Sequence, residues 1–230
     1  MIQPSLKDNI TKLTQRVRLT VEMCGRTQDR ITLLAVSKTR PASELRAAFE
    51  YGIDQFGENY LSEALEKMAD LQDLPLTWHF IGPIQSNKTR AIAGHFAWVQ
   101  SVDREKIARR LAEQRPADLP PLNVCIQVNI SAEASKSGAS PRDLPALAQC
   151  ISELPALRLR GLMAIPARSD DPAQRRAVFA ELHSLYRELR AVHPSVDTLS
   201  MGMSGDFAEA IAEGATLLRI GSALFGPRNG

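Results

Sequence analysis

The regular alternation of short apolar runs with longer stretches of helical period constrains the fold of this chain more than any other feature. Six apolar runs, several of them rich in β-branched residues, predict strands at 33–36, 78–81, 97–100, 124–128, 159–163 and 216–220. Two weaker runs, at 55–57 and 198–200, bring the set to eight. Strands that alternate with helices in this way favour a parallel sheet.

Helical patterns fill the intervals between these strands. Pro41 and Pro141 stand where prolines of a first helical turn are favoured. Apolar residues with helical spacing cover four further stretches, 60–71, 104–114, 172–192 and 205–213. Another helix is expected ahead of the first strand, from Leu6 to Arg26, with one apolar face made by Ile10, Leu13, Val17 and Val21.

These elements favour a single α/β domain over residues 1–230, a TIM-type (β/α)8 barrel. The extra N-terminal helix, within 1–30, would pack outside the barrel. Dividing 230 residues among eight βα units gives about 29 residues each, near the lower end for this fold. A doubly wound open sheet is the alternative. The chain contains no Pro/Gly/Ser-rich linker long enough to separate two domains.

Composition and charge exclude several classes of protein and partner. The sequence is 44% hydrophobic and 23% charged, as in ordinary globular proteins. A net charge of +2 is too small to suggest a nucleic-acid or membrane-surface partner. The three cysteines are odd in number and lack C-x-x-C spacing, which favours a reducing compartment. Without a signal peptide or spanning segment, we expect a cytoplasmic protein, and a monomer.

Lys38 follows the first predicted strand, where an apolar barrel wall would meet the mouth. Functional groups of such barrels lie at the carboxyl ends of the strands. Loss of hydration there lowers the pKa of a lysine and makes its neutral amine available for a Schiff base. The alternative is a surface lysine that leaves the strand toward solvent.

Small residues follow the last two predicted strands. Met203-Ser204-Gly205 comes after the seventh, and Gly221-Ser222 comes after the eighth. Loops after strands seven and eight form the usual phosphate site of this fold, where glycine permits close approach and serine hydroxyls donate hydrogen bonds. The alternative is ordinary turn and helix-cap chemistry.

Other candidate residues have a structural interpretation as well. His79 lies inside an apolar strand, where a histidine is either a hydrogen-bonded core residue or faces a ligand. Asn59 follows the second strand and is also placed to cap the next helix. The four histidines show no metal-ligand spacing, so no metal is expected. Patterns of the nucleophile elbow, Walker and Rossmann types are absent.

At these positions the sequence closely resembles the pyridoxal phosphate homeostasis protein family, which is related in fold to the N-terminal barrel of alanine racemase. The most specific block is Trp78-His79-Phe80-Ile81-Gly82-Pro83-Ile84-Gln85-Ser86-Asn87-Lys88. The other blocks are Ala35-Val36-Ser37-Lys38, Phe56-Gly57-Glu58-Asn59-Tyr60, Gly161-Leu162-Met163, Leu199-Ser200-Met201-Gly202-Met203-Ser204 and Arg219-Ile220-Gly221-Ser222-Ala223-Leu224-Phe225-Gly226. Together they extend over positions 35 to 226 in one register.

The resemblance implies that the chain binds pyridoxal 5'-phosphate (PLP), with Lys38 holding it as a Schiff base. It implies seven cofactor-binding residues: Lys38, Asn59, Met201, Ser204, Arg219, Gly221 and Ser222. The serines and the glycine would hold the phosphate, and Asn59 and Met201 would lie near the ring. Arg219 would face the pyridine nitrogen, where a permanent cation disfavours ring protonation and weakens the electron sink.

One loop, 129–138, departs from the family pattern by an alanine where glycine is usual after the serine. Lys136 and Gly138 are retained in it. Lys136 is either an exposed loop lysine or a ligand. The departure leaves the predicted cofactor site unchanged.

Three functions account for these features. The first is a carrier that buffers PLP inside the cell and passes it to apo-enzymes, with no catalytic residue. The second is a PLP-dependent racemase or decarboxylase, which needs an acid or base opposite the lysine. We expect the chain, which ends at Gly230, to lack the domain that supplies part of this machinery. The third, a barrel enzyme for a phosphorylated metabolite, leaves Lys38 unused. The carrier is the favoured interpretation.

Overall fold

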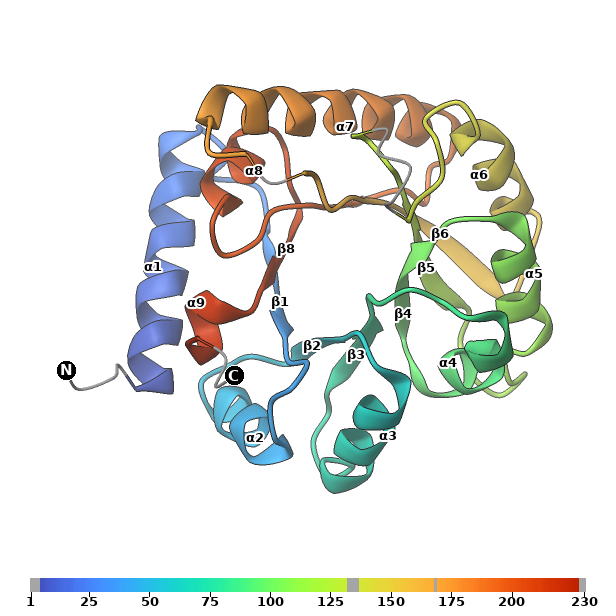
Figure 1. Ribbon diagram of the computed structural model, residues 1–230, viewed down its shortest axis with the longest axis horizontal. Coiled ribbons are helices and arrows are strands. Elements are labelled where there is room, and N and C mark those ends of the chain that lie inside the picture. The colour runs from blue at the N-terminus through green and yellow to red at the C-terminus, as the bar shows by residue number, and fades with distance from the viewer. Residues whose placement is uncertain (1–4, 132–136, 168, 228–230) are drawn as a thin grey trace.

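A computed structural model describes residues 5–131, 137–167 and 169–227 of the chain, and its centre is a closed barrel of eight parallel strands. The strands follow one another around the barrel in chain order, and helices surround them (Figure 1). Their bounds are β1 Thr32–Val36, β2 Gln55–Glu58, β3 Thr77–Phe80, β4 Trp98–Val102, β5 Leu122–Gln127, β6 Leu157–Met163, β7 Thr198–Ser200 and β8 Leu217–Ile220. The barrel predicted from the sequence is confirmed, and the open sheet is excluded.

Pairing of the first strand with the last closes the barrel. Leu34 of β1 lies beside Arg219 of β8, and Ala35 lies beside Ile220. The carboxyl ends of β1 and β8 therefore meet at the same rim. Lys38 and Gly221, which are far apart in sequence, follow these two strand ends.

Helices surround the barrel and cover its apolar outer surface (Figure 1). Their bounds are α1 Leu6–Met23, α2 Ala42–Glu50, α3 Leu61–Asp70, α4 Thr89–His95, α5 Glu105–Glu113, α6 Leu144–Ser152, α7 Pro172–Val192, α8 Phe207–Ala212 and α9 Ser222–Phe225, with a 3-10 turn η1 at Ser86–Lys88. Within the described part of the chain, no helix is both long and apolar enough to cross a membrane.

The expected N-terminal helix is present as α1 and packs outside the barrel (Figure 1). Its four expected apolar residues, Ile10, Leu13, Val17 and Val21, are all buried. Ser5 and Asp8 form a capping box at its start, which satisfies backbone donors of the first turn. Asn9 Nδ2 donates to Leu224 O at 3.0 Å, so α1 is bonded to α9. The helix ends at Met23, three residues before the predicted end.

Several helix boundaries differ from the prediction. Pro41 is the N-cap of α2 rather than a first-turn residue. Pro141 lies in a turn, and α6 begins later at Leu144 with Pro145 in its first turn. α8 begins at Phe207 instead of 205, because Asp206 turns back to bond Met203 N. α9, which follows β8, was not expected at all.

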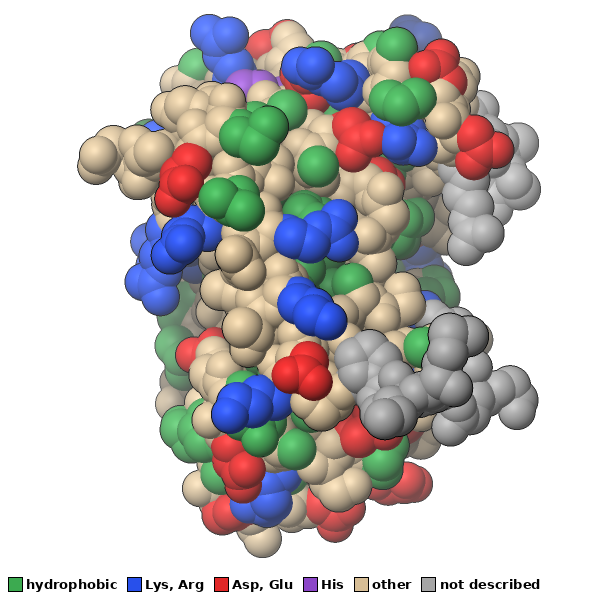
Figure 2. Space-filling model, turned by 90° about the vertical axis from the view of Figure 1, so that its left-hand side faces the viewer, with side chains coloured by type: hydrophobic (Ala, Val, Ile, Leu, Met, Phe, Trp, Pro, Cys, Tyr) green, Lys and Arg blue, Asp and Glu red, His purple; other side chains and the backbone are tan. Residues whose placement is uncertain are grey.

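The face of the molecule that includes α1 carries charged and neutral side chains with small apolar areas between them (Figure 2). Among its exposed large apolar residues are Leu19 and Met23 of α1. Scattered apolar residues are ordinary on a protein surface. This face therefore gives no indication of a binding site.

Candidate functional site

A cavity of about 660 Å³ opens at the carboxyl ends of the strands. Its walls come from the segments that follow β1, β2, β3, β6, β7 and β8, which the barrel brings to one rim. Six of the seven predicted cofactor-binding residues line it: Lys38, Asn59, Ser204, Arg219, Gly221 and Ser222. Barrel closure thus places together residues that span 185 positions of the sequence, from 38 to 222.

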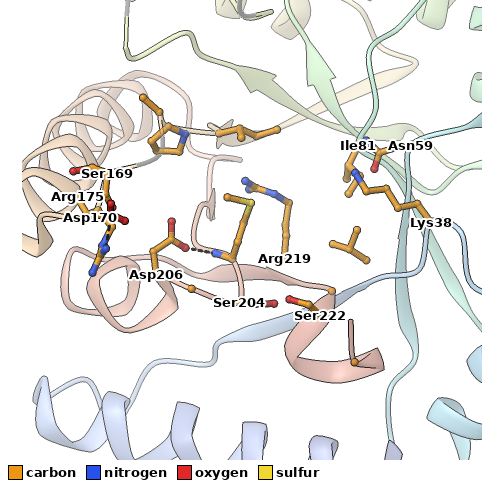
Figure 3. Close-up of a pocket in the computed structure, with 18 of the residues that line it drawn as sticks. Lys38, Asn59, Ile81, Ser169, Asp170, Arg175, Ser204, Asp206, Arg219 and Ser222 are labelled. Atoms are coloured by element: carbon orange, nitrogen blue, oxygen red, sulfur yellow. Dashed lines mark hydrogen bonds between the residues drawn. The ribbon is translucent and has the colours of Figure 1, made fainter. Parts of the chain in front are cut away.

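The lining residues form two opposed sides with a floor between them (Figure 3). Lys38, Asn59 and Ile81 lie on one side, and Asp170, Arg175 and Asp206 lie on the other. Arg219, Ser204 and Ser222 lie between these two sides. An amine, a guanidinium and two hydroxyls therefore belong to the lining of one cavity.

Lys38 projects into the cavity from the end of β1 (Figure 3). It is partly buried, and Ser37 before it is completely buried. Thr39 after it has φ 65°, the left-handed region that a β-branched residue rarely adopts. The chain therefore turns sharply immediately after the lysine.

The two small-residue loops are joined to each other by a hydrogen bond. Ala223 N donates to Ser204 Oγ at 3.1 Å. The Ser204 hydroxyl is an acceptor in this bond and keeps its own proton for a ligand. Gly202 makes the turn before it at φ 88°, where an added Cβ would lie 2.6 Å from the Ala210 Cβ. Only glycine fits here without displacing α8.

Arg219 is a buried cation whose hydrogen bonds go to neutral oxygen atoms. Its exposed fraction is 4%, and it donates to Ser200 O at 2.7 Å, Ser200 Oγ at 2.8 Å and Ala164 O at 2.7 Å. Within the described residues, no carboxylate lies at ion-pair distance from it. Burial lowers its pKa to about 10, so it remains charged at neutral pH.

A chain of hydrogen bonds through the barrel interior fixes Arg219 from behind. Ser200 Oγ donates to Gln100 Oε1 at 2.6 Å, and Gln100 Nε2 lies 2.9 Å from His79 Nδ1. His79 Nε2 lies 3.1 Å from Gln55 Oε1. Sequence reasoning did not find Gln55, Gln100 or Ser200 as parts of the site. The signal in the sequence that could have indicated them is a polar residue within each of these short strands.

His79 belongs to the core and not to the cavity lining. It is fully buried, and it stacks on Trp98 with ring centroids 5.1 Å apart. Burial lowers its pKa to about 3, so the ring is neutral at physiological pH. Gln100 donates to Nδ1, which leaves the proton on Nε2 for Gln55. Of the two interpretations from the sequence, the hydrogen-bonded core residue is confirmed.

Asn59 lines the cavity beside Lys38, and its Oδ1 is buried without a hydrogen-bond partner. The backbone here is closely packed, because a Cβ on Gly82 would lie 2.2 Å from Asn59 O. Met201 is buried in the core and is not among the lining residues, whereas Met203 is. A contact of Met201 with a cofactor ring stays a prediction. Lys136 lies outside the described residues.

The cavity suits an anionic ligand that also carries a donor group. Its side chains include four cations, Lys38, Arg40, Arg175 and Arg219, against two carboxylates, Asp170 and Asp206. PLP fits this description, because its phosphate is an anion and its ring carries a hydroxyl group, and Asn59, whose Oδ1 has no hydrogen-bond partner, belongs to the same lining. In the described ranges, no cluster of side chains has the composition of a metal site.

Comparison with known proteins places the chain among relatives of one kind. The family model described as "Alanine racemase, N-terminal domain" matches residues 9–229. A pyridoxal phosphate homeostasis protein of Pseudomonas aeruginosa is 60% identical over 225 residues, which cover 98% of this chain and 96% of that protein. Its counterpart in Escherichia coli is 49% identical over 224 residues, with 96% of each chain covered.

Solved structures agree with this placement. PipY of Synechococcus elongatus, with PLP bound, is 36% identical to this chain and has a TM-score of 0.84. The match covers 96% of this chain and 100% of that one. Alanine racemase of Corynebacterium glutamicum, 17% identical with a TM-score of 0.66, shares the fold over 98% of this chain and 61% of its own. The chain therefore belongs to the family of alanine racemase N-terminal domains and, within that family, to the pyridoxal phosphate homeostasis proteins.

Proposed function

We propose that this protein binds PLP in the rim cavity, holds it through a reversible Schiff base with Lys38, and so carries and buffers the cofactor. One observation carries the proposal: Lys38, Arg219 and the pair Ser204 and Ser222 line the same cavity. We propose that the Lys38 amine meets the aldehyde, that the Arg219 guanidinium faces the pyridine nitrogen, and that the two serine hydroxyls donate to the phosphate. PLP supplies a reactive aldehyde and an electron-withdrawing ring.

The phosphate is proposed to lie at the joined loops after β7 and β8. Ser204 and Ser222 offer hydroxyl donors there. Gly221 has no side chain to separate its backbone from a phosphate, and the space beside its Cα is open, because the nearest atoms to an added Cβ would be those of Val36, at 3.6 Å or more. Bonds from hydroxyls to a charged phosphate are stronger than bonds between neutral groups. These loops are therefore proposed to give the cofactor its affinity independently of the lysine.

Several relatives support this function by what their own names and structures state. PipY has been solved with PLP bound, and the bacterial relatives at 49–60% identity are named pyridoxal phosphate homeostasis proteins. The best experiment is an absorption spectrum of the purified protein loaded with PLP, before and after borohydride reduction, with mapping of the modified lysine. Label mainly at Lys88 or Lys136 would overturn the assignment of Lys38.

Replacing the lysine gives the matched test. Lys38→Ala is expected to abolish the Schiff-base absorbance, because no amine is left at that position to condense with the aldehyde. Lys106→Ala, which removes an exposed lysine of α5, is expected to leave it unchanged. Noncovalent PLP is expected to remain in Lys38→Ala, held by its phosphate.

Catalysis is the competing function, because fold relatives include alanine racemase and diaminopimelate decarboxylase. Racemisation needs an acid or base on the face opposite the lysine. Asp170 and Asp206 are the carboxylates on that side of the cavity, and Asp206 Oδ1 already accepts from Met203 N at 2.6 Å. The described lining contains no histidine, tyrosine or cysteine. We therefore propose a carrier without substantial turnover.

The proposal includes the protein's partners and location. A carrier of this kind would deliver PLP to apo forms of PLP-dependent enzymes, and we propose that it does so as a cytoplasmic monomer. All three cysteines are free thiols, which is consistent with a reducing compartment. Transfer to an apo-enzyme, and the mass of the protein in solution by light scattering, test these two points separately.

A further inference from the structure

A buried cluster of charged residues lies directly behind Lys38, outside the cavity. Lys67 of α3 is 5% exposed, and its Nζ donates to Ser37 O at 2.7 Å, Glu58 Oε1 at 2.8 Å and Glu63 Oε1 at 2.5 Å. These three bonds use every donor of the ammonium group. Glu58, at the end of β2, is completely buried. We name Glu58, Glu63 and Lys67 the rear cluster.

The rear cluster bonds the residues on both sides of Lys38. Ser37 Oγ donates to Glu58 Oε1 at 2.6 Å, and Ser37 O accepts from Lys67. Thr39 N donates to Glu63 Oε1 at 2.5 Å. The peptide groups before and after the lysine are thus tied to β2 and α3. Nothing in the cluster lines the cavity, so it does not contact a ligand there.

The bond from Thr39 N stabilises a strained backbone. Thr39 has φ 65°, and it is the only described residue other than glycine with a positive φ. Such a conformation persists where surrounding contacts hold it, and it is common at functional sites. Glu63 supplies that contact from the next helix. Without it, the turn after Lys38 has less to keep it in this conformation.

We propose that the rear cluster is a positioning device that directs Lys38 toward the cofactor aldehyde, an inference that rests on the proposed function. In the covalent step the Lys38 amine adds to the aldehyde carbon, a C=N bond forms, and one water molecule leaves. The equilibrium of this step depends on the fraction of molecules in which the amine lies close enough to that carbon to react. The cluster fixes the backbone from which the lysine extends.

Glu63→Ala tests this with little risk to folding, because the Glu63 side chain is 26% exposed. We expect a three- to tenfold weaker PLP affinity, the usual effect of losing one hydrogen bond, because the bond from Thr39 N is the one that holds the turn after Lys38, while Lys67 keeps its bonds to Glu58 and Ser37 O. Binding of pyridoxine 5'-phosphate, which has an alcohol in place of the aldehyde, is expected to stay within twofold. Glu63→Gln is expected to restore PLP affinity, because its amide oxygen still accepts from Thr39 N. Glu66→Ala, on the exposed side of α3, is the charge-matched control.

The outcomes separate this inference from the proposed function. If the unmodified protein forms no Schiff base at Lys38, the proposed function fails. If it does, and Glu63→Ala binds PLP as tightly as Glu66→Ala does, the positioning role is overturned. Equal weakening of PLP and pyridoxine 5'-phosphate overturns it too, because that indicates a general loss of the cavity. Glu58→Gln combined with Lys67→Met removes both buried charges together and is expected to weaken PLP binding selectively in the same way.

Discussion

At the scale of single residues, Arg219 shows how surroundings determine chemistry. Three bonds to neutral oxygen atoms and nearly complete burial hold its guanidinium in one orientation. Although burial lowers its pKa to about 10, the group stays cationic at neutral pH. If it faces the pyridine nitrogen, as proposed, it disfavours protonation of the ring and so weakens the electron sink. Such an effect would make carbanion chemistry at the cofactor harder, in line with the proposed carrier.

The two serines of the cavity are predicted to distinguish phosphorylated from unphosphorylated ligand. Replacing Ser204 and Ser222 together by Ala is expected to weaken PLP binding much more than pyridoxal binding, because their hydroxyls are proposed to serve the phosphate alone. Each lost bond to a charged group costs about 1.5–3 kcal/mol. Equilibrium titrations with both ligands measure this, and equal weakening of both would place the phosphate elsewhere.

His79 is predicted to make stability depend on pH. Its folded pKa of about 3 lies below the ordinary 6.5, so between these values the unfolded chain binds more protons than the folded protein. Stability from this residue is therefore complete above pH 6.5 and falls as pH drops, by at most about 1.36 kcal/mol per pH unit. Urea unfolding between pH 7 and 5 is expected to show a shallower fall for His79→Gln than for the unmodified protein. Identical slopes would contradict the neutral buried histidine.

At the scale of elements, the segments that follow β2 and β3 are packed closely against each other beside the cavity. The carbonyl of Asn59 occupies the space that a side chain at position 82 would need. Ser101 Oγ also donates to Gly82 O at 2.6 Å, which bonds the end of β4 to the same turn. These contacts hold the backbone of Asn59, which lines the cavity.

Gly82→Ala is predicted to disturb this packing and the site together. An added Cβ would lie 2.2 Å from Asn59 O, so the backbone must shift. We expect a loss of about 1–3 kcal/mol in the free energy of unfolding, typical of overpacking, together with weaker PLP binding. Gly94→Ala is the control, because it lies in α4 with nothing within 4 Å of the added Cβ. That helical substitution is expected to be neutral or to stabilise by up to about 1 kcal/mol. A similar loss in both variants would exclude the specific clash.

At the scale of the whole molecule, closure of the barrel makes the site. Pairing of β1 with β8 brings the segment of Lys38 beside the segments of Arg219 and Ser222. The interior hydrogen-bond chain crosses the barrel from Gln55 of β2 to Arg219 of β8. The orientation of one cavity residue thus depends on strands from the opposite part of the barrel.

The loaded protein is predicted to hold PLP, to release it to an apo-enzyme, and to show no substantial racemisation or decarboxylation of amino acids. If Arg219 faces the ring, as proposed, its charge disfavours the carbanion that both reactions need. Chiral chromatography with common L- and D-amino acids measures racemisation, and carbon dioxide release measures decarboxylation. Turnover in the usual enzyme range of about 1–10³ s⁻¹ would contradict the carrier. Loss of that turnover in Asp206→Asn would then identify the opposing acid.

The sequence by itself determined the architecture and the principal residues of the site. The alternation of apolar runs with helical patterns is local, and it predicted eight strands in a parallel sheet, with a barrel favoured and an open sheet as the alternative. Lys38, Asn59, Ser204, Gly221 and Ser222 follow strand ends and Arg219 lies near the end of β8, so the fold brings all six to one rim. Helix boundaries were less accurate, because local bonds such as the one from Met203 N to Asp206 Oδ1 form between particular atoms.

The tertiary structure alone decided what surrounds these residues. Gln55, Gln100 and Ser200 look like ordinary polar residues in the sequence, and only the closed barrel aligns them between His79 and Arg219. Lys67 and Glu63 look like solvent-exposed charges of a helix, yet they lie behind Lys38 and bond its neighbours. The physical reason is that burial and hydrogen bonding depend on distances between strands and helices remote in sequence. No periodicity along one segment records those distances.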